Sequence, residues 1–84
     1  MKKEEIYKLK ELLSVKTDKV SRAILNVIEN RLNESQVFVE YMANVSIENR
    51  DENIYYIARD AARYLSGNIE LGEWLPANLM NELS

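Results

Sequence analysis

No glycine or proline occurs in the first 66 residues of this chain, and this absence limits the folds open to it. Gly67, Gly72 and the single proline, Pro76, all lie in the last fifth of the 84 residues. β-proteins need frequent turns, which glycine and proline usually supply, whereas helix interiors tolerate neither residue well. A chain of this length has room for one core. We therefore predict a single all-α domain over residues 1–84.

Apolar residues recur at three- and four-residue spacing in the first half of the chain, which predicts two amphipathic helices there. The first helix is expected from Lys3 to about Val15. The second is expected to follow Thr17, whose hydroxyl suits an N-cap, with Asp18 in the first turn where the helix dipole favours an acid.

A third main helix and a short last helix are predicted in the second half. The third begins at Asn49 or Asp51 and ends at Ser66–Gly67, where glycine can take the left-handed conformation. Two alanines on its apolar stripe would let a neighbouring helix approach closely. Proline suits the first position of a helix, so a short helix is expected over Pro76–Leu83.

The sequence allows two interpretations of the second helix near Asn33: it either ends there or continues. Phe38, Met42 and Val45 keep the phase of its apolar stripe, as they would in one long central helix. Asn33 and Gln36, however, have the spacing of a capping box, which would start a new helix. The expected fold is thus a bundle of three main helices and a short C-terminal one, with the long central helix as an alternative.

The composition removes most catalytic chemistry. The chain has no cysteine and no histidine, so disulfides, thiol nucleophiles, zinc fingers and imidazole acid–base catalysis are impossible. Glu29, Glu34 and Glu40 have no partner at an activating spacing, and no glycine-rich phosphate loop is present. We expect no enzymatic activity, no cofactor and no metal.

Charge and hydropathy bear on compartment and partners. The chain has 11 basic and 14 acidic residues, a net charge of −3, which disfavours nucleic acid as a partner. No apolar segment is long enough for a secretory signal or a membrane span, so we expect a cytoplasmic protein that does not bind membranes.

One candidate binding surface lies on the third predicted helix. Tyr56, Arg59 and Arg63 project opposite its apolar stripe, and tyrosine and arginine are frequent in protein interfaces. The simpler interpretation is an exposed face on which Asp60 and Glu52 pair the arginines. A recognition helix of a helix-turn-helix DNA-binding protein is the remaining interpretation.

Two further sets of residues are candidates. Trp74, next to Leu75, either closes one end of the core or anchors a partner. On a long central helix, polar side chains would interrupt the apolar stripe and could fix the register of a homodimer. The residues of this dimer hypothesis are Arg31, Glu34, Phe38 and Met42.

These observations favour a non-catalytic module that binds another protein. Such a chain would act as an inhibitor, an immunity or antitoxin-like factor, or an adaptor. A composition rich in Lys, Asn, Ile and Glu suits an AT-rich source such as a low-GC bacterium or its phage. The alternatives are a DNA-binding regulator that uses Tyr56, Arg59 and Arg63, and a structural helical homodimer or assembly component.

Overall fold

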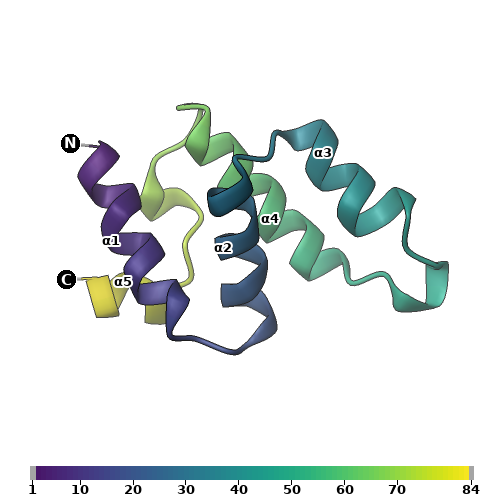
Figure 1. Ribbon diagram of the computed structural model, residues 1–84, viewed down its shortest axis with the longest axis horizontal. Coiled ribbons are helices and arrows are strands. Elements are labelled where there is room, and N and C mark those ends of the chain that lie inside the picture. Colours follow the sequence, from purple (N-terminus) through teal and green to yellow (C-terminus); the bar gives the residue numbers. More distant parts are fainter. Residues whose placement is uncertain (1, 84) are drawn as a thin grey trace.

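The computed structural model describes residues 2–83 and is all-α, as predicted. Three single-turn segments join the α-helices: a π-helix, η1, and two 3-10 turns, η2 and η3. In chain order the elements are α1 (Lys2–Ser14), α2 (Lys19–Asn30), α3 (Glu34–Phe38), η1 (Val39–Ala43), η2 (Ile47–Asn49), α4 (Glu52–Leu65), η3 (Leu71–Glu73) and α5 (Ala77–Leu83) (Figure 1).

Helix α2 lies at the centre and packs against both α1 and α4. Figure 1 shows α1 and α5 together at one end of the molecule and α3 at the other. The core contains Leu9 and Leu13 from α1 and Ile24 from α2, all fully buried. Helix α4 contributes Ala58 and Ala61, whose small side chains let α2 come close, as the sequence predicted.

The helix starts follow the expected chemistry with one correction. Asp18, not Thr17, is the N-cap of α2: its Oδ2 accepts a hydrogen bond from the Ser21 backbone N–H at 2.9 Å. That bond lowers the pKa of the Asp18 carboxyl, because the N–H stabilises the charged form. Thr17 was the wrong choice because Asp18 already reaches the N–H of the third helical residue. Asp51, one of the two predicted caps, begins α4.

The second helix ends at Asn30, so the long central helix is wrong. Leu32 N–H donates to Val27 O at 3.1 Å and Arg31 N–H to Ile28 O at 3.3 Å, the pair of bonds that defines a Schellman motif. Arg31 has a φ of 50° and thus occupies the left-handed position of this motif. Left-handed backbone costs a non-glycine residue about 1–2 kcal/mol.

Helix α4 ends in the same motif but with glycine at that position. Asn68 N–H donates to Arg63 O at 2.9 Å and Gly67 N–H to Tyr64 O at 3.0 Å. Gly67 has a φ of 88°, which glycine adopts without a Cβ clash. The predicted end of this helix is therefore confirmed, and it gives a direct comparison for Arg31.

A capping box starts α3 immediately after the break. Gln36 N–H donates to Asn33 Oδ1 at 2.8 Å, and Asn33 N–H donates to Gln36 Oε1 at 2.9 Å. The break also changes the helical phase, so Val37 is buried while Phe38 is 49% exposed and Met42 is half-buried. The prediction that Phe38 and Met42 continue the apolar stripe of the second helix is therefore wrong, because the break ends that stripe at Asn30.

A buried tyrosine joins α4 to the N-terminal helix. Tyr64 is 1% exposed, and its Oη donates to Glu5 Oε1 at 2.6 Å. The Lys2 ammonium lies 5.0 Å from the centre of its ring. Burial and then the hydrogen bond to Glu5 raise the pKa of Tyr64 far above its ordinary value.

The C-terminal segment returns the chain to α1. Leu71, Leu75 and Leu79 are buried, and the predicted short helix begins at Ala77, one residue after Pro76. An ion pair of 2.6 Å between Lys16 Nζ and Glu82 Oε2 joins α5 to the segment after α1.

Candidate functional site

The three predicted binding residues of α4 lie on its outer side. Tyr56 is 46% exposed, and the Arg59 guanidinium carbon lies 5.0 Å from the centre of its ring. This cation–π arrangement holds two flexible side chains in one place at the surface. Arg59 and Arg63 are half-buried rather than fully extended into solvent.

Both arginines have carboxylate partners. Arg63 Nε lies 2.7 Å from Glu34 Oε1, and Asp60 Oδ1 lies 3.9 Å from Arg63 Nη1 and 3.5 Å from Arg59 Nη2. The bond to Glu34 raises the pKa of the Arg63 guanidinium. The predicted pairing by Asp60 is thus present, but the second acid is Glu34 of α3; no ion pair of Glu52 occurs in the part of the chain that the structure describes.

Aromatic rings extend this cluster from α4 onto α3. The Phe38 and Tyr55 rings meet edge to face, with centres 6.1 Å apart, and the Tyr55 and Tyr56 centres lie 5.4 Å apart. We name the whole area the α3/α4 surface. Its residues are Glu34, Phe38, Tyr55, Tyr56, Arg59, Asp60 and Arg63.

The fold therefore joins residues that the sequence put into separate hypotheses. Glu34 and Phe38 were expected at a homodimer register site, whereas Tyr56, Arg59 and Arg63 were expected on a partner-binding helix. The turn between α2 and α3 sets α3 beside α4 and brings the two sets together. Sequence spacing could not show this, because the contact spans 29 residues of chain.

The remaining candidates lie elsewhere. Trp74 packs against Tyr64, with ring centres 5.6 Å apart, and is half-buried against the core. Leu75 is only 6% exposed, so it faces the core and not a partner, a correction to its place among the binding candidates. Arg31 is exposed at the end of α2, and Met42 is half-buried in η1.

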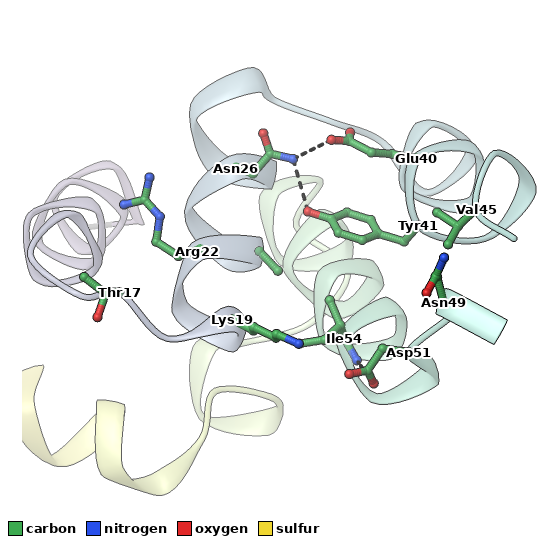
Figure 2. Close-up of a pocket in the computed structure, with 11 residues that line it drawn as sticks. Thr17, Lys19, Arg22, Asn26, Glu40, Tyr41, Val45, Asn49, Asp51 and Ile54 are labelled. Carbon is green, nitrogen blue, oxygen red and sulfur yellow. Dashed lines mark hydrogen bonds between the residues drawn. The ribbon is translucent and has the colours of Figure 1, made fainter.

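A groove that the sequence did not predict lies between α2, η1 and the start of α4 (Figure 2). Its volume is about 530 Å³. Asn26 Nδ2 donates to Glu40 Oε1 at 3.0 Å and to Tyr41 Oη at 3.1 Å across the groove. Burial raises the pKa of the Tyr41 phenol above its ordinary value. No periodicity or motif marked Asn26, because its partners come from a different helix.

The π-helical turn explains how two adjacent side chains reach this groove. Val39–Ala43 forms a π-helix, a rare geometry that widens one turn of backbone. Both Glu40 and Tyr41 line the groove from this turn. The two acids of the groove, Glu40 and Asp51, accept hydrogen bonds from Asn26 and from helix N–H groups, which indicates a structural role for them.

Residues 2–83 contain neither a metal-binding cluster nor a membrane-spanning helix. Within that range, no three His, Cys, Asp or Glu side chains gather closely enough to hold a metal ion. No helix described there has the length and apolar character needed to cross a membrane.

Comparisons with protein family models, curated proteins and solved structures give no match for this chain.

Proposed function

We propose that this chain is a non-catalytic interaction module that binds another protein through the α3/α4 surface. It would act as an inhibitor, an immunity factor or an adaptor by occupying a surface of its partner. The observation that carries this proposal is the exposure of Phe38 and Tyr56, at 49% and 46%, next to arginines already held in place.

The physical argument concerns the cost of binding. Burying a phenylalanine and a tyrosine ring away from water is favourable, and such rings dominate interface energies. The Arg59 guanidinium is fixed over Tyr56 and beside Asp60, so less side-chain freedom would be lost when a partner docks.

The charge pattern favours protein over nucleic acid. Arg59 and Arg63 each lie within 4 Å of a carboxylate, and the surface has two basic and two acidic side chains. Duplex binding needs cations that can neutralise phosphates, and carboxylates beside each arginine oppose this. A partner with its own mixture of apolar and charged side chains fits better.

The test uses a tagged chain to capture partners from cells, followed by binding of the purified partner. Tyr56→Ala and Arg59→Ala should each weaken binding by about 30-fold, the level of an interface hot spot. Arg63 is unsuitable for this test, because its removal would also separate Glu34 of α3 from α4.

Tyr7→Ala is the matched control, since Tyr7 is 65% exposed on α1, outside the α3/α4 surface. It should bind as the unchanged chain does, and all three variants should keep their melting temperature within a few degrees. Equal binding by all three variants would contradict the proposal. So would self-association as the only interaction, or retention by DNA that salt weakens.

A further inference from the structure

The left-handed arginine at the end of α2 points to a second recognition element. Arg31 occupies the Schellman position at which α4 has Gly67, although glycine would hold this backbone with less strain. No hydrogen bond or ion pair joins its guanidinium to the residues that the structure describes. The side chain is exposed, so core packing does not account for it either.

Arg31 borders a groove of about 530 Å³ between the ends of α2 and α4, which we name the helix-end groove. Leu32, Ala62 and Leu65 supply apolar wall at its base, and each packs in or against the core. Asn68 lies on its rim. The groove can therefore accept an aliphatic side chain below and polar groups above.

Among the residues that the structure describes, the Arg31 guanidinium gives the helix-end groove one unpaired positive charge. Its carboxylate, Glu34, is bound to Arg63 at 2.7 Å, which leaves the Arg31 charge without a counterpart. The ends of α2 and α4 add partial negative charge nearby, but a full guanidinium charge outweighs it at contact distance. An anionic group would therefore bind at the outer side of Arg31, away from the helix ends.

We propose that the helix-end groove binds an acidic peptide segment of the partner protein, with a carboxylate on Arg31 and a neighbouring aliphatic side chain on Leu32 and Leu65. This inference rests on the proposed function, since Glu34 makes the groove continuous with the α3/α4 surface. A peptide suits it better than a small molecule, because small-molecule sites usually enclose most of the ligand surface. The exposed rim of Arg31 and Asn68 leaves this groove open.

The probe is a capped peptide, acetyl-Gly-Glu-Leu-Gly-amide, titrated into the ¹⁵N-labelled chain at millimolar concentration. We expect saturable amide shifts at Arg31, Leu32, Ser66 and Asn68. The same peptide with Gln in place of Glu should bind roughly fivefold more weakly, since one exposed charge pair is lost.

Arg31→Gly is the decisive variant, because it removes the proposed ligand group and relieves the backbone at once. The Arg31→Gly variant should show no peptide-induced amide shifts. Its melting temperature should stay unchanged or rise by roughly 2–5 °C. The rise is small because the greater conformational freedom of glycine in the unfolded chain offsets part of the relieved backbone strain. Lys8→Gln, an exposed cation of α1 outside the groove, and Tyr56→Ala should both bind the peptide normally.

Several results would overturn the inference. One is equal binding of the Glu and Gln peptides, and another is full binding by Arg31→Gly. A fall in the melting temperature of Arg31→Gly would assign the side chain to the fold. Groove shifts that follow protein concentration alone would name a second copy as the occupant, and shifts with oligothymidylate would name phosphate. Because the peptide titration needs no natural partner, it tests the helix-end groove even if the α3/α4 surface proves to bind no protein.

Discussion

The hydrogen bond between Tyr64 and Glu5 gives the sharpest prediction about stability. Tyr64→Phe keeps the ring against Trp74 and beneath Lys2, but it leaves the half-buried Glu5 carboxylate without its phenol donor. At 2.6 Å and with a charged acceptor, the bond belongs to the strong class, worth about 1.5–3 kcal/mol.

Since Glu5 is half-buried and keeps some contact with water, we expect the lower end of that range. The free energy of unfolding should fall by about 1.5 kcal/mol. In a domain of this size the melting temperature should fall by roughly 6–12 °C. Urea unfolding followed by circular dichroism at 222 nm measures the first quantity, and a thermal melt measures the second.

A double-mutant cycle isolates the bond from the ring. Glu5→Ala, Tyr64→Phe and the double variant should show a coupling of about 1 kcal/mol. Tyr7→Phe removes a hydroxyl from a tyrosine that is 65% exposed and should change stability by under about 0.5 kcal/mol. Additive effects of the two changes, within about 0.3 kcal/mol, would refute the assignment of this bond as a link between α1 and α4.

Three further predictions concern other parts of the fold. The pKa values of Tyr41 and Tyr64 are raised, so their stabilisation is complete below the ordinary tyrosine value of 10.0 and falls progressively as the pH rises from that value toward the raised ones. Urea midpoints that stay constant from pH 8 to pH 11 would contradict this. Trp74 should emit at a blue-shifted wavelength, and Trp74→Ala should cost about 3 kcal/mol in urea unfolding, whereas red-shifted emission would show an exposed ring. Asn33→Ala should lower stability by about 1 kcal/mol through loss of the capping box, and a higher melting temperature instead would indicate a helix that continues through this position.

Local signals in the sequence predicted most of the fold. The lack of glycine and proline before Gly67 indicated helices, and the cap at Asp51 and the stop at Ser66–Gly67 are confirmed. One error lies where two neighbouring residues compete for one role. Thr17 and Asp18 can both cap α2, and only the backbone geometry decides between them.

The candidate site was predicted only in pieces, for a physical reason. Periodicity reports which residues share a face of one helix, but it does not report which helices become neighbours. The turn at Arg31 shifts the phase of everything after it and places Glu34 against Arg63. Asn26 was missed for the same reason, since its bond to Tyr41 joins two helices.

The neighbouring positions of α1 and α5 have a practical consequence for anyone who links this chain to something else. Both helices lie at the end of the molecule away from α3 (Figure 1). A tag, a spin label or a fused protein joined next to either helix would emerge on that side. Immobilisation through either attachment point should therefore leave Phe38 and Tyr56 free to meet a binding protein in solution.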